Sequence, residues 1–269
     1  MSWRTTNKTL QILEGAEKAR YGILAAIAYN VEHITVFVHA AESRRLPLII
    51  QFSPLALIQA SSLVHAAAAA AKAASVSISL HLDHAQNYDQ IKHIADNLPF
   101  DSIMADMSHY EKEENLERAA ALREYCHARW ISAEAETGRI EGGEDGIMDT
   151  GDLEEDVEDF LSAGVDYLAP SAGNLHGDYS PRRAATRYGP DVAKLNNCLR
   201  LQGVSQALNG RARLVLHGTN DSSPELAKAC IRAGVTKFNV NKLVTDEGIK
   251  VLARSMERWM DIMGSSGKA

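Results

Sequence analysis

The amino-acid sequence predicts an α/β protein, a single (β/α)8 (TIM) barrel spanning residues 1–269. Three observations support this prediction. Short apolar or β-branched runs alternate with longer helical patterns along the chain, the chain has 269 residues, and every predicted strand ends at or runs into a polar side chain. Strands that alternate with helices favour parallel pairing, and a (β/α)8 barrel needs roughly 250 residues.

The predicted strands are rich in Val, Ile, Leu and Ala. They cover residues 23–30, 46–53, 76–84, 101–106, 129–136, 165–171, 212–218 and 235–241. Helical patterns follow them at 31–45, 54–74, 87–98, 111–128, 153–164, near 190–208, 224–234 and about 243–262. Eight such pairs favour a closed barrel, and an open doubly wound sheet is the alternative.

The composition excludes several classes of protein. The net charge is −7, so no basic stripe is present to neutralise a nucleic-acid backbone. The mean hydropathy is −0.21, and no run approaches the ~18 apolar residues of a membrane span. The three cysteines are odd in number and far apart, which argues against a disulfide framework and favours the cytoplasm.

Polar residues gather where the strands end, which is where the active site of a (β/α)8 barrel lies. They are Asn30, Ser53, Asp83, His84, Asp106, Glu136, His217 and Asn239, with His176 in the segment after the sixth strand. Because all these ends meet at one mouth of the barrel, we expect one shared site.

Three of these residues are histidines: His84, His176 and His217. Three protein ligands with one open position are typical of catalytic zinc, although cobalt or nickel would also bind three imidazoles. A lone histidine is more often a hydrogen-bonded packing residue. We interpret most of the other seven in that way, or as helix-surface residues: His33, His39, His65, His81, His93, His109 and His127. Gly177 and Gly218, next to two of the three, permit close backbone approach to a phosphate, or simply tight turns.

Eight segments in order carry a family resemblance from about residue 5 to about 262. They are YGILAAIAYNVE, PLIIQFSP, ISLHLDHA, FDSIMADMSHYEKEEN, SAEAETGRIEGGEDG, LAPSAGNLHGDY, LVLHGTND and GVTKFNVN. Together they resemble the class II (zinc-dependent) fructose-bisphosphate and tagatose-bisphosphate aldolases. The resemblance implies reversible cleavage of a phosphorylated ketose to dihydroxyacetone phosphate and an aldehyde, with Zn²⁺ as cofactor and a homodimer or homotetramer as the assembly.

The resemblance also assigns roles to residues. It implies zinc ligation by His84, His176 and His217, and a second or structural metal position at Asp106 and Glu136. Asp83 resembles the acid/base at the C–C bond, and Glu144 resembles the base for the ketose-side proton. Two of these carboxylates have simpler interpretations, Asp83 as support for a metal ligand and Glu144 as a solvated loop residue.

The substrate-binding positions are less regular. Gly177, Gly218 and Asn239 resemble binders of the dihydroxyacetone-phosphate half, and Asn30 and Ser53 match polar rim positions. The family usually has Gly-Gly-Ser or Gly-Ala-Ser after the third histidine and Asn-x-x-Thr on the last strand. This chain has Gly218-Thr219-Asn220 and Asn239-Val240-Asn241-Lys242 instead.

These departures leave alternatives open. The chain could be an aldolase for a different, possibly carboxylated substrate, since Lys242 could hold a phosphate or a carboxylate, or a catalytically impaired homologue that still binds metal and ligand. A Schiff-base aldolase would use Lys237 or Lys242, but three metal ligands would make the covalent adduct redundant. A metal-dependent isomerase or hydrolase barrel fits the histidines but not the ordered segments.

Overall fold

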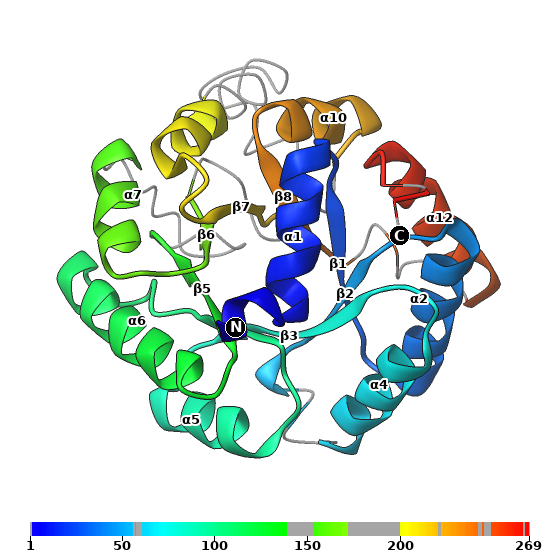
Figure 1. Ribbon diagram of the computed structural model, residues 1–269, viewed down its shortest axis with the longest axis horizontal. Coiled ribbons are helices and arrows are strands. Elements are labelled where there is room, and N and C mark those ends of the chain that lie inside the picture. Colours follow the sequence, from blue (N-terminus) through cyan, green and yellow to red (C-terminus); the bar gives the residue numbers. More distant parts are fainter. Residues whose placement is uncertain are drawn as a thin grey trace, which may run out of the picture.

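The computed structural model describes residues 2–55, 57, 61–138, 153–171, 200–219, 222–241, 244, 249–265 and 267–268. The strands form a closed barrel in the order β1 to β8, and every neighbouring pair is parallel. Helices surround the barrel (Figure 1). The predicted (β/α)8 architecture is confirmed.

Each predicted strand overlaps the strand that forms, and only β3 extends beyond its predicted range, by one residue at Ala85. The strands are β1 (Ile23–Ile27), β2 (Leu48–Phe52), β3 (Ile78–Ala85), β4 (Ser102–Ala105), β5 (Ser132–Glu136), β6 (Tyr167–Ala169), β7 (Arg213–Leu216) and β8 (Val235–Val240). Most are shorter than predicted, because residues at the predicted ends leave the ladder and enter the loops that shape the mouth.

The helices pack against the outside of the barrel. They are α2 (Val31–Arg44), α4 (Ser62–Ala73), α5 (Tyr88–Asn97), α6 (Lys112–His127), α7 (Leu153–Ser162), α10 (Pro224–Arg232) and α12 (Ile249–Ile262), and residues 200–208 are also helical. Their apolar faces and the outward-facing strand residues form the larger core. Asn30, Asn87 and Ser223 begin three of them by accepting a hydrogen bond from a first-turn N–H, the usual N-cap arrangement.

A further helix, α1 (Lys8–Ala19), precedes the first strand and was not among the predicted elements. It lies across one mouth of the barrel (Figure 1). Leu10, Leu13 and Ala16 pack onto inward-facing strand residues in a second core cluster, and Thr9 donates to Ser102 Oγ on β4 over 3.1 Å. Since Ser102 begins its strand, α1 covers the N-terminal mouth, opposite the end where active sites of such barrels form.

The strand interiors alternate in direction, as period-two geometry requires. On β5, Ser132, Glu134 and Glu136 point into the barrel at successive depths, while Ala135 belongs to the outer core. On β8, Lys237 and Asn239 point inward and Phe238 points outward. The inward-facing side chains therefore form layers stacked along the barrel axis. Polar groups fill the upper layer, at the C-terminal mouth, and the middle layer directly below it.

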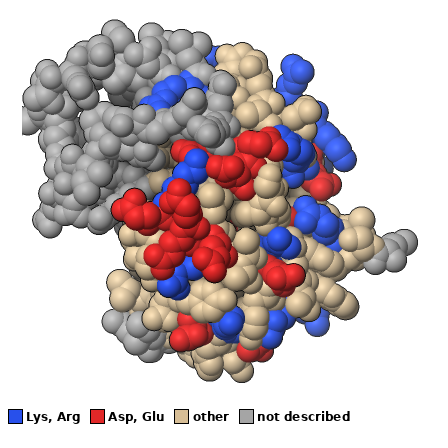
Figure 2. All heavy atoms as spheres, turned by 90° about the vertical axis from the view of Figure 1, so that its left-hand side faces the viewer, with Lys and Arg blue, Asp and Glu red and all other residues tan. Residues whose placement is uncertain are grey.

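The outer face that carries α6 and α7 is rich in charge. Figure 2 shows acidic side chains gathered there with a few basic ones between them. Lys112 on α6 pairs with Asp156 and Asp159 on α7, at 2.6 and 2.9 Å. The Lys112–Asp159 pair is exposed at both ends, and such pairs contribute little stability, whereas Asp156 is buried. None of the helices among the described residues is long and apolar enough to cross a membrane.

Candidate active site

The end of β3 has an irregular backbone that positions two site residues. The β3–β4 register shifts between Leu82 and Ala85, and His84 adopts a left-handed conformation with φ 47°. Left-handed backbone is uncommon for a residue other than glycine and is found often at functional sites. This irregularity lets Asp83 point into the barrel while the His84 side chain lies at the C-terminal mouth.

His84 and His217 meet at this mouth. His84 Nε2 lies 3.0 Å from His217 Nδ1, and the two rings are nearly perpendicular at 85°. Two nitrogens bound to one tetrahedral zinc at 2.0–2.1 Å would lie roughly 3.3 Å apart. The observed pair therefore fits a shared metal after a shift of a few tenths of an ångström.

Carboxylates surround these histidines. Asp106 Oδ2 accepts from His84 Nδ1 over 2.9 Å, and Glu136 Oε2 lies 3.8 Å from His217 Nδ1. Asp83, His84 and His217 present ligand atoms within 4.8 Å of one another, and so do His84, Asp106 and Glu136. Burial opposes charging of His84, but Asp83, Asp106 and Glu136 outweigh it and raise the pKa of His84 to about 10. A metal ion binding there would displace that proton.

The charge balance of the mouth also fits a cation. Four carboxylates, those of Asp83, Asp106, Glu134 and Glu136, are buried at the mouth and in the layer directly below it, and Lys237 is the one buried ammonium among the described residues of the barrel interior. Isolated buried anions are costly unless they are paired or coordinate a metal. The donor set of imidazoles and carboxylates is one that zinc accepts.

Asp83 is held beside the two histidines by Asn239. Its Oδ1 accepts from Asn239 Nδ2 over 2.9 Å, and the same amide nitrogen lies 3.0 Å from His217 Nε2. Burial raises the pKa of the Asp83 carboxyl, while the charges of His84 and Lys237 act in the opposite direction. A buried carboxyl with a raised pKa is suited to acid/base work.

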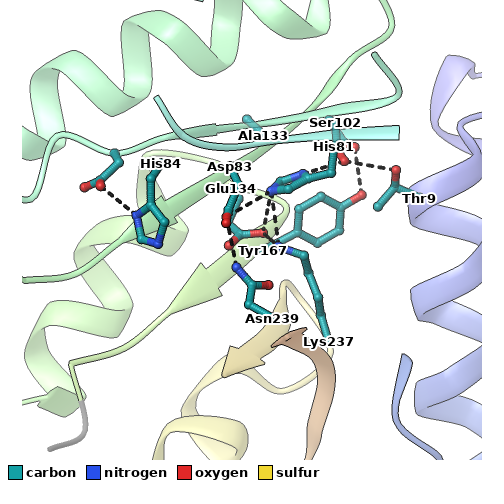
Figure 3. A network of polar contacts seen from close by, with 12 residues as sticks. Thr9, His81, Asp83, His84, Ser102, Ala133, Glu134, Tyr167, Lys237 and Asn239 are labelled. Atoms are coloured by element: carbon teal, nitrogen blue, oxygen red, sulfur yellow. Dashed lines mark hydrogen bonds and ion pairs between the residues drawn. The ribbon is translucent and has the colours of Figure 1, made fainter. Parts of the chain in front are cut away.

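A second polar layer lies directly below. Lys237 Nζ donates to Glu134 Oε2 over 2.6 Å and lies 3.2 Å from His81 Nε2. His81 Nδ1 lies 2.8 Å from Ser102 Oγ. Burial, and then the charge of Lys237, hold the pKa of His81 well below its usual range, so that this imidazole is neutral. Figure 3 shows His81, Glu134 and Lys237 pointing toward one another from three different strands, with Asp83 and Asn239 beside them.

The predicted substrate-binding residues lie at several places around the mouth. Asn30 is exposed and its amide oxygen caps α2 through His33 N. Thr219 is buried and donates to the backbone oxygen of Asn239 over 2.5 Å. Ser53 and Asn241 are half-buried just beyond β2 and β8. Gly218 has φ 69°, a conformation that glycine adopts without strain. Five predicted site residues lie outside the described residues: Glu144, His176, Gly177, Asn220 and Lys242.

The middle layer was not predicted as a group: Lys237 was considered only for a Schiff base, His81 only as a packing or helix-surface residue, and Glu134 not at all. Glu134 stands two residues before Glu136, Lys237 two before Asn239, and His81 two before Asp83. In a strand this spacing places both members of each pair on the same face. The same period-two count that found the strand ends would have found these three residues one layer deeper.

The chain was compared with known proteins. The sequence model of the family described as fructose-bisphosphate aldolase class-II matches residues 7–268. A fructose-bisphosphate aldolase of Streptococcus pneumoniae is 30% identical over 299 residues, which cover 96% of this chain and 98% of that protein. A Coccidioides immitis protein assigned as a fructose-bisphosphate aldolase is 41% identical over 298 residues, covering 98% of this chain and 95% of that one.

Solved structures agree with this relationship. A crystal structure of a Coccidioides immitis protein, also assigned as a fructose-1,6-bisphosphate aldolase, superposes with a TM-score of 0.87 at 40% identity over 98% of both chains. An aldolase of Escherichia coli K12 has the same fold, with a TM-score of 0.73 at 23% identity over 96% of this chain and 97% of that one. The match of nearly the whole chain, together with the histidines and carboxylates at one mouth of the barrel, identifies this protein as a member of the class II fructose-bisphosphate aldolase family, a family of carbon–carbon lyases.

Proposed function

We propose that this protein is a zinc-dependent aldolase that reversibly cleaves fructose 1,6-bisphosphate to dihydroxyacetone phosphate and an aldehyde. The observation that carries the proposal is the convergence of Asp83, His84 and His217 at the C-terminal mouth of a barrel that belongs to this family. The three residues offer an acid/base group beside two imidazole ligands, which is what metal-assisted aldol chemistry needs.

His84 Nε2 and His217 Nδ1 would hold the metal together with His176. Bound zinc would supply Lewis-acid polarisation of the substrate carbonyl, which stabilises the negative charge that develops next to it. Asp106 orients His84 through Nδ1 in the metal-free arrangement. With Glu136, it would also form the second or structural metal position that the family resemblance implies.

Asp83 would move the proton at the breaking bond. In the cleavage direction its carboxylate takes the proton of the C4 hydroxyl, the C3–C4 bond breaks, and the electron pair stays on C3 beside the carbonyl. Glu144 would then return a proton to C3, so that dihydroxyacetone phosphate is released. The hydrogen bond from Asn239 keeps Asp83 aimed at the mouth.

The remaining substrate-binding residues are predictions from the sequence. Gly177, Gly218, Asn239, Asn241 and Lys242 would bind the dihydroxyacetone-phosphate half. Asn30, Ser53, Thr219 and Asn220 would line the rest of the pocket. A homodimer or homotetramer, a cytoplasmic location and a single domain over residues 1–269 stay predictions.

One observation favours a modified phosphate pocket. Thr219 stands where the family usually has a small residue before a serine, and its hydroxyl is already donated to the Asn239 carbonyl. That hydrogen bond joins the ends of β7 and β8. Cleavage of a related phosphorylated or carboxylated ketose is therefore the second candidate function.

Zinc content and cleavage of fructose 1,6-bisphosphate, measured before and after EDTA treatment, test the proposal. We expect about one tightly bound zinc per chain and loss of cleavage on chelation. His217→Ala removes a ligand and should lose both zinc and cleavage. His65→Ala, at an exposed position of α4, should keep both.

Two other outcomes are informative. Wild-type protein that binds no zinc after purification in zinc-containing buffer would contradict the proposal. Bound zinc without cleavage of fructose 1,6-bisphosphate would reject the usual substrate and support the second candidate. A retro-aldol assay over phosphorylated and carboxylated ketoses would then identify the substrate.

A further inference from the structure

The middle layer of the barrel contains a buried ion pair that the proposed reaction does not use. The side chains of Lys237 and Glu134 are both fully buried, and Nζ lies 2.6 Å from Oε2. A buried ion pair often contributes little net stability, because the loss of hydration offsets the attraction. Its location, directly beneath His217, indicates a different use.

The other oxygen of Glu134 reaches this histidine. Glu134 Oε1 lies 3.1 Å from His217 Nε2. A carboxylate can only accept, so this contact requires the proton of His217 to be on Nε2. The lone pair of His217 is then on Nδ1, the nitrogen that lies 3.0 Å from His84 Nε2 at the mouth.

A competing contact would place that proton on the other nitrogen. Asn239 Nδ2, the amide nitrogen that donates to Asp83 Oδ1, lies 3.0 Å from the same His217 Nε2. An amide donor alone would favour an unprotonated Nε2 and a proton on Nδ1. The charge-assisted bond to Glu134 is the stronger of the two.

We propose that Lys237 and Glu134 are positioning residues that hold His217 in the Nε2–H form and thereby turn Nδ1 toward the metal. This inference rests on the proposed function, since it needs the metal to bind at His84 and His217. Metal-ligating histidines commonly donate their second N–H to a carboxylate, and loss of that partner typically weakens metal binding about 10–100-fold.

Lys237 determines which oxygen of the Glu134 carboxylate faces His217. It donates to Glu134 Oε2 and contacts His81 Nε2. The other ring nitrogen of His81, Nδ1, lies within hydrogen-bond distance of Ser102 Oγ. A glutamine in place of Glu134 would turn its oxygen toward the Lys237 ammonium and its NH2 group toward His217 Nε2. That orientation would favour the proton on His217 Nδ1, where the metal should bind.

The test is a cycle of three variants: Glu134→Gln, Lys237→Met and the double variant. Zinc affinity is measured by competition with a chromophoric chelator. We expect Glu134→Gln to bind zinc about 10–100-fold more weakly. We expect the double variant to recover most of this loss, because without the ammonium the oxygen of the introduced glutamine can face His217 and its NH2 group can face His81 Nε2. A double variant no tighter than Glu134→Gln, or a Glu134→Gln protein with wild-type zinc affinity, would overturn the proposal.

The tautomer itself supplies a second readout that needs no metal. In metal-free protein labelled with ¹⁵N-histidine, the His217 resonances are assigned by their loss in His217→Gln. They should show protonated Nε2 in the wild type and in the double variant, and a shift toward protonated Nδ1 in Glu134→Gln. A wild-type His217 protonated on Nδ1 would refute the proposal. Wild-type protein that shows the expected tautomer but binds no zinc would count against the proposed function, and not against the positioning of His217.

If the Glu134→Gln protein fails to fold, two uncharged double variants test the proposal instead. Glu134→Gln/Lys237→Met and Glu134→Met/Lys237→Met carry no buried charge at either position and have similar volume. They differ in whether an oxygen can accept from His217 Nε2. We expect the Met/Met protein to bind zinc at least about tenfold more weakly than the Gln/Met protein, and equal affinities would reject the role of the acceptor.

Discussion

Asp83 and His84 are neighbours in the chain, yet they face different partners because the backbone between them changes direction. The register shift in β3 and the left-handed conformation of His84 separate a carboxylate that points to Asn239 from an imidazole that points to His217. A regular strand would place the two side chains on opposite faces of the sheet. The irregular backbone therefore brings both groups to one site.

Replacement of Asp83 separates acid/base work from metal binding. In Asp83→Asn the side-chain oxygen can still accept from Asn239 Nδ2, so the local arrangement should persist. We expect kcat to fall about 10²–10⁴-fold, the usual contribution of general acid–base catalysis, with zinc content and KM nearly unchanged. Steady-state kinetics and metal analysis on the same preparation measure this. Loss of zinc in the variant would instead make Asp83 a metal ligand.

The sequence predicted the upper layer of the site better than the middle one. Polar residues at strand ends are conspicuous, so Asp83, His84 and His217 could be placed at one mouth. Lys237 and Glu134 lie inside strands that read as core, and they come from β8 and β5. Only closure of the barrel brings them together, and an ionisable residue inside a strand does not reveal its partner by itself.

At the scale of elements, the formation and docking of α1 depend on one residue, Asn7, more than on the helix propensity of its sequence. Asn7 accepts from Leu10 N as the N-cap, and its amide nitrogen donates to the backbone oxygens of Asp101 and Trp130, at 2.7 and 3.0 Å. One side chain thus begins the helix and ties it to the loops that precede β4 and β5. Among the described residues no strand precedes α1, so the alternation of strands and helices did not predict it, although Asn7 and the spacing of Leu10, Leu13 and Ala16 indicate an amphipathic helix.

We expect Asn7→Ala to destabilise the fold by about 2–3 kcal/mol, because the variant loses the N-cap and the two hydrogen bonds from the Asn7 amide group to backbone carbonyls. Thermal unfolding followed by circular dichroism should show a decrease in Tm of roughly 4–12 °C for a chain of this size. Asn7→Ser keeps a capping oxygen but is too short to reach both carbonyls, so its Tm should lie between the other two. Equal Tm values for Asn7→Ser and the wild type would show that the two long-range bonds contribute nothing.

A carboxyl group next to β4 makes the stability depend on pH. Burial raises the pKa of Asp101, while hydrogen bonding to Leu80 N and the charge of Lys8 act against it. The folded state therefore holds the proton more tightly than the unfolded state does. Between the unfolded pKa of about 3.9 and the raised folded pKa, the contribution of this group to stability decreases as the pH rises. Above the folded pKa it stays constant.

Asp101→Asn removes this dependence and keeps an oxygen for Leu80 N. We expect the variant to be more stable than the wild type near neutral pH, with a difference that narrows as the pH falls toward about 4. Urea unfolding at a series of pH values measures the difference. A variant that is less stable than the wild type by the same amount at every pH would show that the charge is not the cause.

At the scale of the whole molecule, successive layers along the barrel axis have different roles. α1 and an apolar layer close the N-terminal mouth, the Lys237–Glu134 pair occupies the middle, and the histidines lie at the C-terminal mouth. The alternation of strands and helices predicted this architecture, because local periodicity determines each element and the chain length then favours closure. The identity of the substrate could not be predicted in the same way, since it depends on loops whose conformation local patterns do not determine.

The position of α1 has a consequence for how the chain folds during synthesis. α1 leaves the ribosome before the eight strands of the barrel, but its partners Asp101, Ser102 and Trp130 are made roughly a hundred residues later. Until then Leu10, Leu13 and Ala16 have only part of the surface that buries them, including β1 and β2. A nascent chain paused before β5 would expose this helix to chaperones or to premature aggregation. α1 is therefore made before the strands that anchor it, and it can dock fully only when about half of the barrel is in place.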